Sequence, residues 1–221
     1  MNIHPRNADP HADARVARSG PPLTDAAVVV VMLHGRGGSA DDILSLAGHL
    51  SDQHDVAFLA PQAWGHTWYP ASFLAPRDVN EPYLSSALRA TGRVLDEAAA
   101  VVGRERVVVL GFSQGACLAC ETVTSRPARY GGLVSFTGGL TSETLEARDG
   151  DLSGTPVVLT GGDPDPHVPW SRVQETADTL RDLGGEVETH RFPGRAHIIG
   201  PDEITRAAAR IATLRTEAHR A

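Results

Sequence analysis

A serine flanked by glycines is the residue of this sequence best suited to nucleophilic chemistry. Ser113 lies at the centre of the pentapeptide 111–115, Gly-Phe-Ser-Gln-Gly, which directly follows the apolar run 107–110. In a Gly-x-Ser-x-Gly turn between a strand and a helix, the serine hydroxyl projects from the sheet edge and the glycines avoid clashes with neighbouring elements. The pattern arises by chance in roughly one chain in fifteen of this length, so a glycine-rich turn without chemistry is the competing interpretation.

Two later loops carry residues that could complete a relay with this serine. Asp165 follows the apolar run 156–159, and His197 follows the run 187–192. Both lie beyond the carboxyl ends of predicted strands, where sites in open α/β sheets are built. In the chain order Ser, Asp, His, the histidine would accept the proton of Ser113 and the aspartate would fix the imidazole tautomer.

Other residues compete for these roles. Asp163 could be the acid instead, or could cap the turn. Of the other histidines, His190 lies inside a predicted strand and His167 lies beside the acid, whereas His34 precedes a glycine loop that it is expected to shape. His197 is favoured because it lies in the loop where the base is expected.

The glycine-rich run 33–38, Leu-His-Gly-Arg-Gly-Gly, follows the first predicted strand and matches the second oxyanion-hole element. We expect the backbone N–H groups of Arg36 and Gln114 to be the two donors. Residues 35–40 also fit the dinucleotide-binding pattern Gly-x-Gly-x-x-Gly/Ala. That motif needs an acidic residue about twenty positions on. Residues 60–62 read Ala-Pro-Gln, which disfavours phosphate binding.

Alternating strands and helices must position these residues. Strands are predicted at residues 28–33, 56–60, 107–110, 133–136, 156–159 and 187–192. Most of these runs have few polar interruptions, which suits strands buried on both faces of a parallel sheet. Helices are predicted at residues 39–50, at 84–102, at 113–125, from Ser171 to the glycines 184–185, and from Pro201 towards Ala218. Ser39 and Asp42 form a capping box at the start of the first of these helices. The alternation predicts an α/β fold with a mostly parallel central sheet flanked by helices.

Length and composition set further bounds. The 221 residues fit one domain with a tail. Residues 1–24, His4 and His11 included, are predicted to form a disordered or loosely attached tail, and residues 25–221 the folded domain. A formal charge of −7 argues against nucleic acid as a partner. The longest apolar run has eight residues, too short for a membrane span, and no signal peptide is recognised, so a cytoplasmic protein is expected.

Two further features bear on the site. Cys117 and Cys120 lie three apart on a predicted helix and are interpreted as small core residues, with a redox or metal pair as the alternative. Residues 62–82 form a long stretch without periodicity, and its aromatic residues are predicted either to wall a substrate pocket or to pack the loop onto the core. These aromatic residues are Trp64, Trp68, Tyr69 and Phe73.

Together, four ordered motifs resemble the phospholipase/carboxylesterase family of α/β-hydrolases, which includes the acyl-protein thioesterases. The motifs are residues 34–38, 111–116, 162–169 and 194–197, and the likeness runs from about Val28 to Leu214. The resemblance implies an α/β-hydrolase fold without a large cap domain, Asp165 as the acid, no metal or cofactor, and a possible homodimer. The segment 64–73 is similar to a bacterial subgroup rather than to the thioesterases that depalmitoylate proteins.

We therefore expect a serine carboxylesterase that cleaves short- to medium-chain esters through an acyl-enzyme. Acyl thioesterase or lysophospholipase activity, or acyl transfer on the same site, is the alternative, and a catalytically dead binding module is the non-enzyme alternative. We also hypothesise that Arg36, Arg77 or Arg195 attracts substrates that carry a carboxylate, with Arg36 favoured because it lies in the oxyanion loop.

Overall fold

The central element of the fold is a seven-stranded sheet with the order β1-β3-β2-β4-β5-β6-β7. The computed structural model describes residues 9–145 and 148–220. Only the edge strand β1 runs antiparallel to its neighbour, β3, and all other pairs are parallel. The strands are β1 (Val16–Ser19), β2 (Val28–Leu33), β3 (Val56–Pro61), β4 (Val107–Phe112), β5 (Gly132–Phe136), β6 (Pro156–Asp163) and β7 (Glu186–Pro193).

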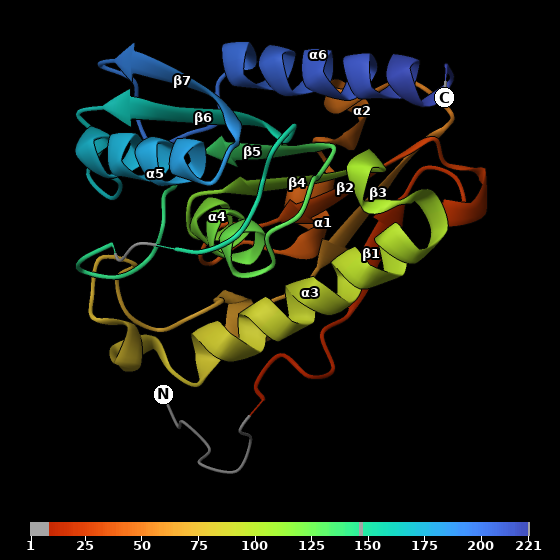
Figure 1. Cartoon of the computed structure of the whole chain (residues 1–221). Coiled ribbons are helices and arrows are strands. Elements are labelled where there is room, and N and C mark those ends of the chain that lie inside the picture. The colour runs from red at the N-terminus through yellow and green to blue at the C-terminus, as the bar shows by residue number, and fades with distance from the viewer. Residues whose placement is uncertain (1–8, 146–147, 221) are drawn as a thin grey trace.

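Helices cover both faces of the sheet and make three layers (Figure 1). The helices are α1 (Ala40–Leu44), α2 (Ala47–Leu50), α3 (Tyr83–Val102), α4 (Gln114–Ser125), α5 (Trp170–Asp182) and α6 (Pro201–Ala218). The apolar faces of α3, α4 and α5 pack on one side of the sheet, and those of α1, α2 and α6 on the other. The successive valines of β2 alternate between these two cores, which is why the strand is apolar without interruption. No separate cap domain lies over the sheet within the described residues.

The prediction of a disordered or loosely attached tail is wrong for the part of residues 1–24 that the structure describes. Residues Val16–Ser19 form β1 and pair with β3, and His11 is fully buried. The Nε2 atom of His11 donates to the Trp68 carbonyl at 3.0 Å, and its Nδ1 accepts from the Trp64 N–H at 3.1 Å. These partners lie more than fifty residues away, so no local pattern signals them. His4 lies outside the described residues.

The helix predicted at residues 39–50 is two short helices, α1 and α2. The capping box of Ser39 and Asp42 is present at its start, as predicted. The break follows Ser45, whose hydroxyl donates to the Asp42 carbonyl at 2.7 Å. Such a local side-chain bond competes with the helical backbone and often bends or ends a helix.

Candidate active site

Ser113 lies on the sharp turn between β4 and α4, at the carboxyl edge of the sheet. Its backbone has φ 54° and ψ −118°, a left-handed conformation that is strained for a residue with a side chain. A Cβ on Gly111 would lie 2.3 Å from the Gly115 carbonyl oxygen, and one on Gly115 would lie 2.1 Å from the Leu33 carbonyl oxygen. The turn therefore requires both glycines of the pentapeptide.

The three residues predicted to form a relay meet at this turn. His197 Nε2 lies 2.8 Å from Ser113 Oγ, and His197 Nδ1 lies 2.8 Å from Asp165 Oδ2. Residues separated by 84 and 32 positions in the sequence thus form one continuous chain of hydrogen bonds. The His197 side chain is 17% exposed and that of Asp165 is fully buried, so the relay opens to solvent on the serine side.

The Asp165 carboxylate is held by three groups. Its Oδ1 accepts from the backbone N–H groups of His167 and Val168, both at 2.8 Å, while its Oδ2 faces His197. Burial by itself raises the pKa of this carboxyl, but the two backbone donors and His197 outweigh that effect and lower the pKa below its usual value. Asp165 is therefore ionised at neutral pH. Asp163, the alternative acid, instead forms an ion pair with Arg191.

Two aromatic rings flank the imidazole. The ring of Phe112 lies 5.3 Å from that of His197 between centroids, and the ring of His167 packs edge-on at 4.8 Å. Phe112 precedes Ser113 and His167 lies two residues after Asp165, but the sequence pattern does not reveal where these side chains point. Both rings therefore pack against the imidazole that joins Ser113 to Asp165.

The two predicted oxyanion donors adjoin the serine. Arg36 and Gln114 both line the cavity that contains Ser113, and neither backbone N–H has a hydrogen-bond partner in the described chain. Gln114 is the first residue of α4, where backbone N–H groups lack intrahelical acceptors. Its side chain is buried and fixes the aromatic loop by bonding the Trp68 N–H at 2.9 Å and the Tyr69 carbonyl at 2.8 Å.

A cavity of about 480 Å³ opens beside Ser113. Of the four aromatic residues predicted to wall it, Tyr69 and Phe73 do line it. The prediction is wrong for the two tryptophans. Trp68 points into the core, fully buried, with its indole N–H donating to the His34 carbonyl at 2.8 Å, and Trp64 is 55% exposed. The cavity is also lined by residues that the sequence analysis had not assigned to it, namely Gly35, Pro70, Ala71, Ser72, Phe112, Cys117, His167 and Val168.

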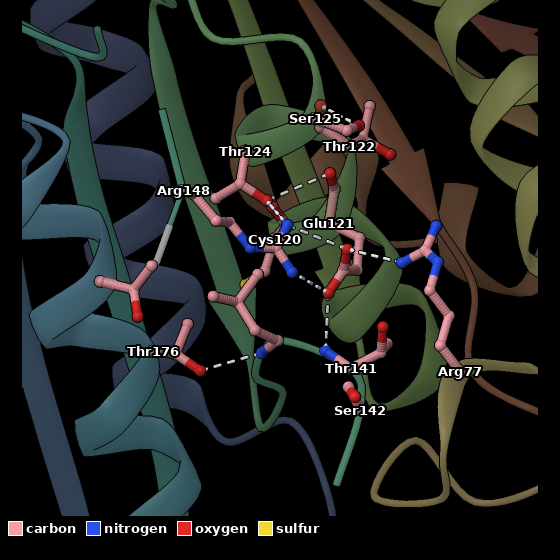
Figure 2. Close-up of polar contacts among 12 residues, drawn as sticks. Arg77, Cys120, Glu121, Thr122, Thr124, Ser125, Thr141, Ser142, Arg148 and Thr176 are labelled. Carbon is pink, nitrogen blue, oxygen red and sulfur yellow. Dashed lines mark hydrogen bonds and ion pairs between the residues drawn. The ribbon is translucent and has the colours of Figure 1, made fainter. Parts of the chain in front are cut away.

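The loops around the cavity are tied to α4 by a buried carboxylate. Glu121 accepts from the backbone N–H of Thr141 at 2.8 Å and binds Arg148 at 2.9 Å, and Arg77 approaches it from the other side at 3.5 Å (Figure 2). The next residue, Ser142, donates its N–H to the carbonyl of Phe73 at 2.7 Å. Glu121 thus links α4, the helix that follows Ser113, to the loop that forms the cavity wall.

No group of three or more His, Cys, Asp or Glu side chains suited to a metal ion is found among residues 9–145 and 148–220. Cys117 and Cys120 are both buried free thiols, and burial raises the pKa of Cys117 to about 12. The two therefore belong to the core, as predicted, and Cys117 also reaches the cavity. In the same described part of the chain, no helix is both long enough and apolar enough to cross a bilayer.

Comparison with known proteins places this arrangement among hydrolases. A family model described as Phospholipase/Carboxylesterase matches residues 14–215. The crystal structure of a phospholipase/carboxylesterase from Dyadobacter fermentans DSM 18053 superposes with a TM-score of 0.87 at 44% identity, covering 93% of this chain and 100% of that one. Acyl-protein thioesterase 1 of Eremothecium gossypii is 28% identical over 218 residues, 90% of this chain and 91% of its own length. Acyl-protein thioesterase 1 of Gibberella zeae is 29% identical over 110 residues, which span 48% of this chain and 46% of that protein.

Proposed function

The chain belongs to the phospholipase/carboxylesterase family and is a carboxylic ester hydrolase of the α/β-hydrolase fold, and from this premise we propose that it works through an acyl-enzyme on Ser113. The observation that carries the proposal is the chain of hydrogen bonds from Ser113 Oγ through His197 to Asp165, with 2.8 Å at each step. A nucleophile, a base and an orienting acid within bonding reach are what acyl transfer requires.

In the proposed first step, Ser113 Oγ attacks the ester carbonyl while its proton passes to His197 Nε2. The carbonyl oxygen takes up the electron pair of its π bond and is stabilised by the N–H groups of Arg36 and Gln114. Collapse of this tetrahedral intermediate breaks the ester bond, and His197 returns the proton to the leaving alcohol. In the second step, water attacks the acyl-enzyme in the same way and gives a proton to His197. Collapse then releases the acid and returns the proton to Ser113 Oγ. Asp165, ionised and buried, stabilises the imidazolium in both steps.

The cavity supports short- to medium-chain substrates. Its volume of about 480 Å³ lies toward the small end of the usual range for ligand pockets, and Tyr69, Phe73 and Val168 give it an apolar wall. Hydrolysis of acyl thioesters or lysophospholipids, or transfer of the acyl group to another acceptor, would use the same groups. A cytoplasmic location and a homodimer remain predictions.

Replacing Ser113 by Ala tests the proposal. We expect kcat on an activated butyrate ester to fall by about four orders of magnitude or more, because the nucleophile is lost. A fluorophosphonate probe should label the wild type at Ser113, as located by peptide mass spectrometry, and should not label the variant. A folded Ser113→Ala protein that keeps its activity, or an adduct on another residue, would refute the assignment. Absence of both turnover and labelling in the wild type would favour a binding module.

A further inference from the structure

We propose that the cavity selects esters that carry a carboxylate, which Arg36 binds. The inference rests on the proposed function and names a substrate class for it. It follows from the charges that face the cavity, from the way in which the guanidinium is held, and from the partners of the other arginines considered for this role.

Among the described residues that line the cavity, Arg36 carries the one permanent charge. No aspartate or glutamate belongs to this described lining, and its other titratable side chains are Tyr69, Cys117, His167 and His197. No carboxylate lies within ion-pairing distance of Arg36 in the described chain. The cavity therefore presents an uncompensated positive charge beside the serine.

The guanidinium is held in place by neutral groups. Its Nη1 donates to the Pro70 carbonyl at 2.9 Å and its Nη2 to the Ala71 carbonyl at 2.6 Å, while its centre lies 6.0 Å from the centroid of the Tyr69 ring. These two bonds use two of the five guanidinium N–H groups, and the other three have no partner among the described residues. An arginine fixed in advance loses little rotamer freedom when it binds a carboxylate.

The other two arginines hypothesised for this role are committed elsewhere. Arg77 pairs with Glu81 and approaches the buried Glu121, as Figure 2 shows for the latter, and Arg195 pairs with the buried Glu203. Neither arginine lines the cavity. Of the three candidates, only Arg36 is left with a charge that a substrate could neutralise.

The negative charge of the whole protein does not oppose this local preference. The formal net charge of −7 acts at long range, where salt at physiological strength screens it beyond roughly 8 Å. A substrate carboxylate in the cavity would interact with Arg36 well inside that distance.

The test compares matched neutral and carboxylated esters. The acyl arm uses the p-nitrophenyl esters of butyrate and of hemisuccinate, and the leaving-group arm uses phenyl acetate and its ring-carboxylated analogue. We expect the wild type to prefer the anionic member of at least one pair by about tenfold in kcat/KM, as one charge-assisted contact allows, mainly through KM. The arm that shows the preference identifies the side of the scissile bond that faces Arg36. The preference should shrink as salt is raised.

Arg36→Gln should bring the ratio for that pair close to one, whereas Arg36→Lys should retain part of it. The ratio is the readout because Arg36 also holds the 70–71 loop, so a disturbed loop would alter the turnover of both esters. The control is Arg15→Gln, which removes the same charge from an exposed side chain outside the cavity and should leave the ratio unchanged.

The possible failures are distinguishable. If the wild type hydrolyses the neutral esters but favours neither anionic one, or if Arg36→Gln keeps the wild-type ratio, the inference is wrong and the proposed function stands. If the wild type cleaves none of the four esters and its Ser113 takes no fluorophosphonate, the proposed function fails and the inference fails with it. If Arg36→Gln does not fold, the salt dependence of the wild-type ratio and the Arg36→Lys ratio decide between these outcomes.

Discussion

Arg195 and Glu203 form a two-point ion pair next to the candidate base. Arg195 Nη1 lies 2.7 Å from Glu203 Oε2, and Arg195 Nη2 lies 2.8 Å from Glu203 Oε1. Glu203 is fully buried in the first turn of α6 and also accepts from the Gly200 N–H and the Thr160 hydroxyl. Since Arg195 precedes His197 by two residues, this carboxylate fixes the loop that delivers the imidazole to Ser113.

Glu203→Gln should therefore weaken both the fold and the relay. It leaves the largely buried guanidinium of Arg195 without its counter-charge, so we expect a loss of about 3 kcal/mol in the free energy of unfolding. A shift of His197 by a fraction of an ångström should also lower kcat about tenfold or more with little change in KM. Urea denaturation and ester kinetics measure the two effects.

The matched control is Glu217→Gln on the same helix, whose carboxylate pairs with Arg210 but is 55% exposed. It should change stability by no more than about 1 kcal/mol and leave kcat unaltered. Equal effects of the two substitutions would show that the buried pair does not position His197.

The buried His11 should make the stability of the protein depend on pH. Its Nδ1 accepts a hydrogen bond while its Nε2 donates one, so the ring is neutral in the folded state. Burial lowers the pKa of His11 below 6.5, and the bond to the Trp68 carbonyl offsets this only in part. The unfolded chain binds the proton more readily, so stability is complete above about pH 6.5 and is lost as the pH falls towards the folded pKa.

The free energy of unfolding should consequently be lower at pH 5 than at pH 7.5. The difference is at most about 1.4 kcal/mol for each factor of ten by which the unfolded chain binds the His11 proton more tightly than the folded chain. His11→Gln should reduce that difference in stability, and the remainder should come from His34, whose pKa burial lowers in the same way. His54→Gln, at an exposed position, is the control and should preserve it. An unchanged pH dependence in His11→Gln would contradict the prediction.

Gly115→Ala should disrupt the turn that carries Ser113. The added methyl group would lie 2.1 Å from the Leu33 carbonyl oxygen, a backbone atom, so β2 or α4 must move. We expect a loss of about 3 kcal/mol or more in the free energy of unfolding and a large fall in fluorophosphonate labelling. Thermal denaturation and the labelling rate measure these effects.

Gly48→Ala provides the contrast for that substitution. A Cβ at this exposed position in α2 meets no atom of the described residues within 4 Å, so alanine should stabilise the protein by up to about 1 kcal/mol. If both alanines had the same small effect, close approach of the backbone could not be the reason for glycine at position 115.

The sequence by itself determined the architecture and the relay. Strands that are mostly apolar and alternate with amphipathic helices are local patterns, and they predicted the six strands from β2 to β7, although β7 itself is largely polar. The glycines of the pentapeptide, together with the carboxyl ends of β6 and β7, predicted that Ser113, Asp165 and His197 would meet. These inferences succeed because strand order, strand direction and turn chemistry leave few places for such side chains.

The tertiary structure alone decided which neighbours those residues have. Nothing local indicates that Trp68 turns into the core while Tyr69 faces the cavity, that residues 16–19 add an edge strand, or that Glu203 anchors the His197 loop. The direction of a loop side chain and the partner of a buried charge depend on elements that are distant in the sequence. Packing and the need to pair buried polar groups select among arrangements that the chain permits locally.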